Sequence, residues 1–341
     1  MRGVWRAKRM INRVMPQGAI LLYHRVADES LDPQLLCVSP AHFNEHLQVL
    51  RRCCRPMRLG SLASRYRFGL APDRAAVVTF DDGYADNLIG ATPILERNDF
   101  PATVFVASGN VGHSAEFWWD ELDRLFLTEG SLPDDLHIRI NGAICQWSLG
   151  DSANYNTATT QKHSGWTVLS PGTPTMRHEI YRFLCKALKG MAWEQQQRVL
   201  GTLQKWAGVG PASRSVRRAL TPDEVVRLDR GGIVEVGAHT MNHSMLSALP
   251  ADAQKLEIMQ GKHQLEEWLG RHVNTFAYPY GDKTDYTRET VKLVREAGFK
   301  CACSNYEDHL YPWIDRYQLP RFMVRDWSGE EFEKRLSEHF A

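Results

Sequence analysis

Two adjacent aspartates, Asp81 and Asp82, follow the apolar segment 75–80 and precede Gly83. Neighbouring side chains on extended backbone point in different directions, so packing of a buried strand gives no reason for adjacent carboxylates at its end. One carboxylate could bind a metal ion while the other faces a water molecule bound to that ion. Asp-Asp-Gly is also good turn chemistry, and an ordinary turn explains this stretch equally well when it is taken alone.

Two histidines, His239 and His243, follow a second apolar segment, 232–238. If a helical turn begins there, both imidazoles lie on one face and can bind one metal ion. Two histidines and one carboxylate are typical of a catalytic rather than a structural zinc site. The alternative is a pair of surface histidines. It is less favoured because both motifs end predicted parallel strands, and the carboxyl ends of such strands share one edge of the sheet.

Taken together and in this order, TFDDG (79–83) and HTMNH (239–243) resemble the polysaccharide deacetylase family, also called NodB-homology or carbohydrate esterase family 4. The resemblance covers residues 18–110 and 220–325. It implies a metal-dependent enzyme on a distorted (β/α) barrel that removes N-acetyl groups from amino sugars.

Position by position, the resemblance assigns roles to these residues. Asp82, His239 and His243 would bind a divalent metal ion, expected to be Zn²⁺, and Asp81 would be the general base that activates water. FAYPYG (276–281) matches the third motif of the family, in which the backbone N–H of Tyr280 would help to stabilise the oxyanion.

The chain departs from the family pattern at two positions. The arginine expected two residues before Pro279 is Ala277, and Arg321 occupies the place of the histidine that serves as general acid. His339 lies too late in the chain to replace that histidine. We hypothesise that Arg321 orients Asp81 in place of the missing arginine.

His24 is the candidate for the missing general acid. It ends the first predicted strand, so it should share an edge with Asp81 and His239, and it resembles a histidine of the biofilm-polysaccharide branch of the family. Histidine titrates near neutral pH, which suits protonation of a leaving amine. A hydrogen-bonded bystander is an equal alternative for a lone histidine at a strand end.

Alternating strand and helix signals predict an α/β fold. Apolar strands at 75–80 and 101–108 flank a helical segment at 84–98, which indicates a parallel sheet covered on both sides. The alternation resumes after residue 220, and the total of seven or eight units predicts a distorted (β/α)7-8 barrel. Later elements are expected at 221–230, 232–239, 251–269, 274–279, 285–297, 299–304, 321–324 and from 328 onward.

An α+β insertion interrupts the repeat at about 112–218. It should contain an aromatic helix at 117–127, a hairpin about Asn141-Gly142, a mobile polar loop at 151–165, and two helices at 175–190 and 193–206. The expected domains are therefore a basic N-terminal arm (1–17) and a NodB-like barrel (18–341) that carries this insertion. We expect the insertion to cap the face on which barrel loops build sites.

The composition narrows the function classes. Lys and Arg total 41 against 40 Asp and Glu, which argues against a general nucleic-acid binder. No segment approaches the roughly 20 apolar residues of a membrane span. The basic N-terminus lacks the apolar core of a secretory signal, so a cytoplasmic protein with reduced cysteines is expected, with peripheral membrane contact left open.

The sequence thus predicts a hydrolase that removes the N-acetyl group from an N-acetylamino sugar of a glycan, a glycolipid or a precursor. Two alternatives stay open at this point: a non-catalytic sugar-binding protein on the same barrel, favoured by the two missing motif residues, and an amidohydrolase of a non-sugar amide. The sugar, the acyl group, the identity of the metal, the role of the insertion and the oligomeric state are not determined by the sequence.

Overall fold

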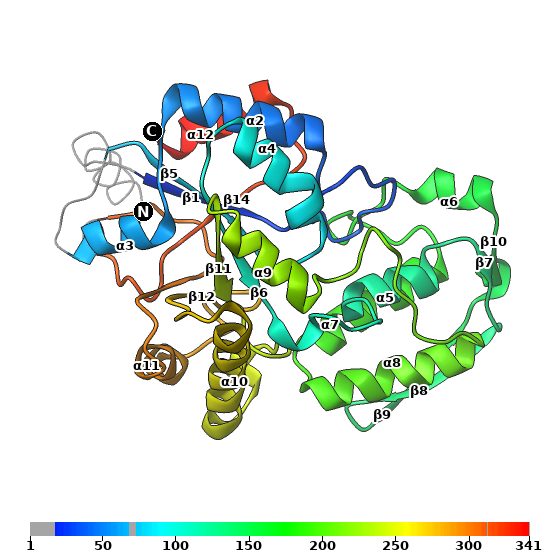
Figure 1. Cartoon of the computed structure of the whole chain (residues 1–341). Coiled ribbons are helices and arrows are strands. Elements are labelled where there is room, and N and C mark those ends of the chain that lie inside the picture. The colour runs from blue at the N-terminus through cyan, green and yellow to red at the C-terminus, as the bar shows by residue number, and fades with distance from the viewer. Residues whose placement is uncertain (1–17, 68–72, 312, 341) are drawn as a thin grey trace, which may run out of the picture. The chain divides into compact units, whose positions relative to one another are not determined.

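The computed structural model describes residues 18–67, 73–311 and 313–340, so the predicted basic arm at 1–17 lies outside the described residues (Figure 1). These residues form two compact units. The barrel unit contains the residues up to Asp28, Leu36–Val111 and those from Leu220 onward, and the insertion unit contains Glu29–Leu35 and Gly112–Ala219.

A parallel sheet forms the centre of the barrel unit (Figure 1). Neighbouring strands pair in parallel, and a short strand β4 (Arg55–Pro56) also pairs with β5. The seven strands run in the order β13 (Cys301–Cys303), β12 (Thr275–Ala277), β11 (Val234–Ala238), β6 (Ala102–Val106), β5 (Ala75–Phe80), β1 (Gly18–Tyr23) and β14 (Phe322–Met323).

The segment 316–323 joins the two edges of this sheet. The N–H of Leu319 donates to Ala302 O at 2.9 Å, beside β13, while Phe322 pairs with Leu21 of β1 three residues later. A single short segment can reach both edges only because the sheet curls round on itself. The predicted α/β fold with a distorted barrel is therefore confirmed, as a curled parallel sheet of seven strands.

Alternate residues of the strands pack into two different hydrophobic clusters. Val78 and Phe80 of β5 belong to a cluster that includes Phe43 and residues of several helices, whereas Ala75 and Val77 pack with strand residues such as Phe105 and with one helical segment, 59–66. Side chains on a strand alternate between its faces, so the second cluster fills the inside of the curled sheet. The same alternation directs Thr79 and then Asp81 toward the inside.

Helices of the barrel unit follow the sequence signals closely. Ser39 caps α2 (Pro40–Cys53), and Thr221 and Glu224 form a capping box at the start of α9 (Pro222–Arg230). Ser328 caps the last helix by accepting the N–H of Glu331. The remaining helices are α3 (Leu59–Arg67), α4 (Thr92–Arg97), α10 (Ala251–Leu269), α11 (Arg288–Glu296) and α12 (Gly329–His339).

The single helix predicted for 84–98 is wrong in its first part. A π-helical turn, η1 (Asn87–Ala91), precedes α4, which begins only at Thr92. The side chain of Asn87 donates to the carbonyl of His24 at 2.8 Å, and the Thr92 hydroxyl donates to the carbonyl of Asn87. Side-chain bonds of this kind give the backbone an alternative to regular helix geometry.

The insertion unit contains the predicted helix–hairpin–helix elements (Figure 1). The hairpin turns at Asn141 and Gly142, both with positive φ, as its sequence predicted. Trp118 and Trp119 of the aromatic helix are buried, so both belong to the core of this unit. The elements are α5 (Trp118–Phe126), β7 (Gly130–Ser131), β8 (Asp135–Ile140), β9 (Ala143–Ser148), β10 (Asn154–Tyr155), α6 (Thr157–His163), α7 (Met176–Lys189) and α8 (Trp193–Ala207).

The prediction that 151–165 is a loop is wrong for much of the segment. Helix α6 occupies Thr157–His163, and the side chain of Asn156 caps it by accepting the N–H of Thr159. None of the residues of α6 is buried. The sequence therefore lacked the apolar periodicity by which a helix is normally predicted, and only the cap marked its start.

Buried ion pairs hold the end of the insertion on α5. Arg214 contacts Glu116 at 2.6 Å and Asp123 at 2.7 Å, and Arg217 contacts Asp120 at 3.1 Å. These carboxylates are almost completely buried, so their charges need the arginines as partners.

Within the described residues, no helix is long and apolar enough to cross a membrane.

Gly261 brings α10 close to the loop that follows β11. A Cβ atom placed on Gly261 would lie 2.5 Å from the carbonyl carbon of Thr240 and 2.8 Å from the backbone nitrogen of Met241. Backbone atoms cannot turn aside as the end of a flexible side chain can. The contact between this helix and the loop therefore depends on the absence of a side chain.

We expect Gly261→Ala to destabilise the protein by about 1–3 kcal/mol, because the added methyl group overpacks this contact. Gly201→Ala is the matched control: Gly201 lies within α8, and a Cβ there would meet nothing within 4 Å. The control should be stabilised by roughly 0.5–1 kcal/mol through helix propensity. Urea unfolding of the three proteins measures both effects, and equal stability of Gly261→Ala and the wild type would contradict the account.

Candidate active site

The predicted site residues follow the ends of neighbouring strands. Asp81 extends β5 and donates its N–H to Tyr23 O at 3.0 Å, and His239 extends β11 and donates its N–H to Val106 O at 3.1 Å. Only β6 lies between β5 and β11 in the sheet. The structure thus brings both motifs to one edge, as the predicted parallel strands required.

Three ligand atoms converge at this edge. Nε2 of His243 lies 3.2 Å from Oδ1 of Asp82, and Nε2 of His239 lies 3.6 Å from the same oxygen. The three side chains are buried, and their ligand atoms all lie within 4.8 Å of one another. Oδ1 of Asp82 accepts no hydrogen bond from any residue that the structure describes. A buried carboxylate oxygen in that position fits a cation as its partner.

The chemistry of the donor set also fits a divalent cation. Nδ1 of His239 lies 2.8 Å from the carbonyl oxygen of Ala277, which can only accept, so Nδ1 carries the proton and Nε2 keeps its lone pair. Burial lowers the pKa of His239 to about 4, which keeps this imidazole neutral near pH 7. Two nitrogens and one oxygen suit Zn²⁺ in a site that leaves positions for water and substrate.

The backbone at this edge is strained. Asp82, Thr240, His243 and Tyr280 all have positive φ, at 76°, 63°, 56° and 60°. Such a conformation costs about 1–3 kcal/mol for each residue without glycine's freedom, and it is found mainly where surrounding structure enforces it. Residues 239–243 therefore form an irregular turn rather than the helical turn that we considered, yet both imidazoles still face Asp82.

Glu257 of α10 holds the turn that carries the histidines. Its carboxylate accepts the backbone N–H of Asn242 at 2.9 Å and the side-chain amide of Asn242 at 2.7 Å, and its carbonyl accepts the N–H of Met241 at 2.9 Å. On the other side, the N–H of Gly109 donates to Met241 O at 2.7 Å. This role of Glu257 was not predicted from the sequence, because nothing in its helical spacing distinguishes it from a surface glutamate.

Arg321 forms a bidentate ion pair with Asp81. Nη1 and Nη2 donate to the two carboxylate oxygens at 2.6 and 2.7 Å, and Nε donates to Ser304 O at 2.7 Å. Both side chains are buried. Burial alone would raise the pKa of Asp81, but the charge and hydrogen bonds of Arg321, together with the nearby His239 and His24, outweigh burial and lower the pKa, so the carboxylate stays ionised. The hypothesised contact is present, and its part in catalysis stays a prediction.

Ala277 stands where the family pattern has an arginine, and Arg321 supplies the guanidinium group instead. Its side chain is fully buried within the curled sheet, and its carbonyl binds His239. Arg321 reaches Asp81 from the segment that closes the sheet. The guanidinium group therefore comes from a different part of the chain.

His24 and Tyr280 also lie at this edge. Burial lowers the pKa of His24, while the charges of Asp82 and Asp81 oppose the shift, which places the imidazole within the field of both carboxylates. The ring of Tyr280 meets the imidazole of His243 edge-on, with centroids 4.7 Å apart. The acid role of His24 and the oxyanion role of the Tyr280 N–H stay predictions.

A comparison with known protein families shows to which family the chain belongs. A family profile described as polysaccharide deacetylase matches residues 69–130 and 183–302, which is more than half of the chain. The chain belongs to the polysaccharide deacetylase family. The predicted resemblance is confirmed, and with it membership of a family of carbohydrate deacetylases, which are hydrolases.

Individual relatives agree with this assignment. YxkH of Bacillus subtilis (strain 168), a protein named for the same family, is 26% identical over 141 residues, which are 40% of this chain and 48% of YxkH. The chain thus spans about half the length of that relative.

Two solved structures show the same fold. The deacetylase PplD of Streptococcus pyogenes, solved in complex with acetate, has a TM-score of 0.54 and 18% identity, covering 96% of this chain and 100% of PplD. A de-N-acetylase from Aggregatibacter actinomycetemcomitans has a TM-score of 0.55 and 14% identity, covering 94% and 99%.

We expect Glu257→Ala to weaken Zn²⁺ binding by about 10- to 100-fold, because the turn that carries His243 loses the contacts that fix it. Competition with a chromophoric chelator measures the affinity without reference to activity. Glu267→Ala is the matched control, since Glu267 is exposed on the same helix, and it should bind as tightly as the wild type. Equal affinities of the two variants would show that Glu257 does not position the ligands.

Proposed function

We propose that the protein is a metal-dependent hydrolase that removes the N-acetyl group from an N-acetylamino sugar of a glycan, a glycolipid or a precursor. The observation that carries the proposal is the buried cluster of Asp82, His239 and His243 beside the ion pair of Asp81 and Arg321. A carboxylate that is fixed but not needed as a ligand is what a general base requires.

The metal ion is proposed to be Zn²⁺, held by Asp82, His239 and His243. A divalent cation there would supply Lewis-acid activation of water and of the amide carbonyl. Two imidazole nitrogens and one carboxylate oxygen leave positions for both of these oxygens. The fixed tautomer of His239 keeps its lone pair directed at the cluster.

Asp81 is proposed to take the proton from the attacking water. Oδ2 of Asp81 lies 3.8 Å from Nε2 of His239, so a water at the cluster lies within reach of this carboxylate. The two hydrogen bonds from Arg321 fix the plane of the carboxylate and keep it ionised. Fixing the base before the substrate arrives lowers the entropy cost of proton transfer.

The remaining steps use Tyr280 and His24. The N–H of Tyr280 is proposed to donate to the oxygen of the tetrahedral intermediate. His24 is proposed to protonate the amine as the amide C–N bond breaks. The hydroxyl of the water stays on the acyl carbon and leaves as acetate, while the sugar keeps the amine.

The sugar-binding alternative rested on the two missing motif residues. One of these two absences now counts less in favour of that alternative. Ala277 replaces the arginine of the family pattern, but Arg321 supplies a guanidinium group to Asp81 from another part of the chain. Cytoplasmic location and peripheral membrane contact stay predictions from the sequence.

Acetate release from a panel of N-acetylated sugars and oligosaccharides, with and without a chelator, tests the proposal. Asp81→Asn should lower turnover by about 10²- to 10⁴-fold and keep the metal, because it removes the base and no ligand. Asp82→Asn should lose metal affinity and turnover together. No release from any substrate by folded, metal-loaded protein would overturn the proposed function, and loss of metal in Asp81→Asn would overturn the division of roles.

Arg321→Lys examines the orienting contact in the same assay. A lysine keeps the charge but cannot form two parallel hydrogen bonds, so kcat should fall while metal affinity is kept. Arg316→Lys, a change of the same kind nearby in the chain, should leave kcat unchanged. Intact turnover of Arg321→Lys would sink the role of Arg321.

A further inference from the structure

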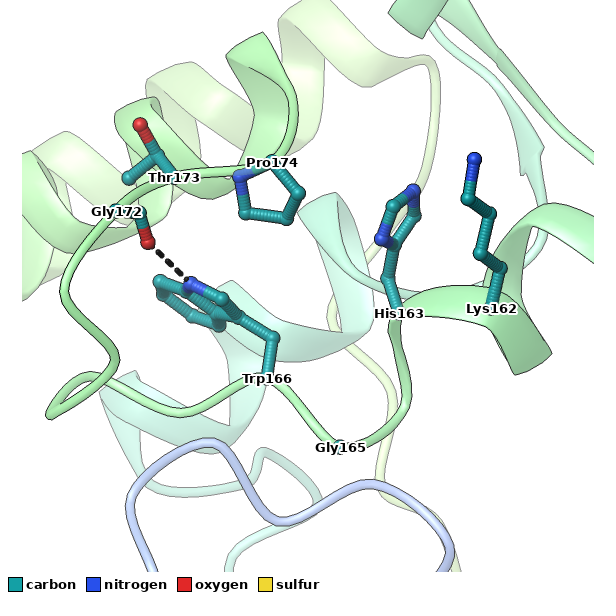
Figure 2. Close-up of a pocket in the computed structure, with 7 residues that line it drawn as sticks. All are labelled: Lys162, His163, Gly165, Trp166, Gly172, Thr173 and Pro174. Carbon is teal, nitrogen blue, oxygen red and sulfur yellow. Dashed lines mark hydrogen bonds between the residues drawn. The ribbon is translucent and has the colours of Figure 1, made fainter.

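The insertion unit contains a pocket of its own, with a volume of about 410 Å³ (Figure 2). Pockets that bind small molecules typically measure roughly 300–1,000 Å³, so this one has room for a sugar residue. In Figure 2 the rings of Trp166, Pro174 and His163 surround the central space, and Lys162 lies beyond His163.

The wall of the pocket is fixed before any ligand binds. The indole N–H of Trp166 donates to Gly172 O at 2.8 Å, and the guanidinium of Arg182 donates to Ser170 O at 2.7 Å and to Gly172 O at 3.1 Å. The same guanidinium lies 5.0 Å from the centre of the Trp166 ring, which also meets His178 edge-on at 4.7 Å. A prebuilt wall lowers the entropy cost of binding.

The chemistry of the lining suits a sugar. The exposed ring of Pro174 can pack against the C–H face of a pyranose, and the half-buried imidazole of His163 can exchange hydrogen bonds with hydroxyl groups. Trp166 is only 8% exposed, so it forms the base of the pocket rather than a stacking surface. Burial and then the charge of Lys162 lower the pKa of His163, so this imidazole is neutral near pH 7. Of the lining residues that the structure describes, none carries a carboxylate.

Lys162 makes the pocket sensitive to charge. It is exposed and lines the pocket together with His163, so its ammonium group raises the local potential without a lining acid to offset it. The reaction proposed above converts a neutral N-acetylamino sugar into a cationic amino sugar. The substrate and the product of that reaction therefore differ in charge, and the ammonium group of Lys162 makes the pocket respond to that difference.

We propose that this pocket binds an N-acetylated sugar residue of a glycan and disfavours the de-N-acetylated residue through repulsion by Lys162. The choice of ligand rests on the proposed function. Such a site would keep the protein on stretches of glycan that are still acetylated and release stretches that have been processed. The rings of Pro174 and His163 supply affinity for both forms, and Lys162 supplies the discrimination.

Calorimetric titration of the full chain carrying Asp81→Asn, which should slow turnover by about 10²- to 10⁴-fold, tests the proposal. The probes are an N-acetylglucosamine oligosaccharide and its de-N-acetylated form, at a pH at which the amines are protonated. The acetylated form should bind more tightly by about two- to fivefold, as expected for one exposed charge pair. His163→Ala and Pro174→Ala should weaken binding of both forms by about tenfold, because each removes ring contact.

Lys162→Glu should reverse the preference, while Lys186→Glu, an exposed charge reversal outside the pocket, should leave it unchanged. No binding of either probe, or affinities that the pocket variants do not alter, would overturn the proposal. Binding that the pocket variants weaken, in a protein whose wild type releases no acetate, would uphold the pocket and sink the proposed function. Acetate release by the wild type, with sugar binding that these variants do not change, would uphold the proposed function and overturn the role of the pocket.

Discussion

The buried ion pair between Asp81 and Arg321 connects the closure of the fold to its chemistry. Arg321 lies on the segment that pairs with β13 at Leu319 and with β1 at Phe322, and its guanidinium spans the inside of the curled sheet to Asp81. Burying two charges costs several kcal/mol for each ion, so the pair is favourable only with the two-point geometry that is observed. Loss of either partner would leave a buried charge uncompensated, at a cost of about 3–5 kcal/mol.

The pair also frees Asp82 for a different task. Arg321 pairs with both oxygens of Asp81, and Asp82 is the carboxylate that lies close to both imidazoles. The positive φ of Asp82 turns its side chain away from the course of the strand. On the opposite side of the cluster, the positive φ angles of Thr240 and His243 shape the turn that carries the two imidazoles. The hydrogen bond from Asn242 to Glu257 and the close approach of Gly261 to Thr240 hold this turn in place. Rigid neighbours thus offset local strain and hold the ligand atoms together.

Much of this arrangement could be predicted because it follows from short-range patterns. Apolar strands ended by Asp81 and His239 had to share an edge once the sheet was parallel, and capping residues such as Thr221 marked where helices begin. Contacts made across long stretches of chain could not be predicted in the same way. Asn242 and Glu257 are fifteen residues apart without a spacing that signals contact, and Trp166 reads as one more aromatic residue in a polar segment.

An anomalous-scattering crystal structure of the Zn²⁺-loaded protein would separate the metal ligands from the base, because it locates the metal without reference to activity. We expect zinc within coordination distance of Asp82, His239 and His243, with Asp81 still paired to Arg321 through two hydrogen bonds. Zinc bound by Asp81, with Arg321 released from it, would contradict the assignment of Asp81 as the base.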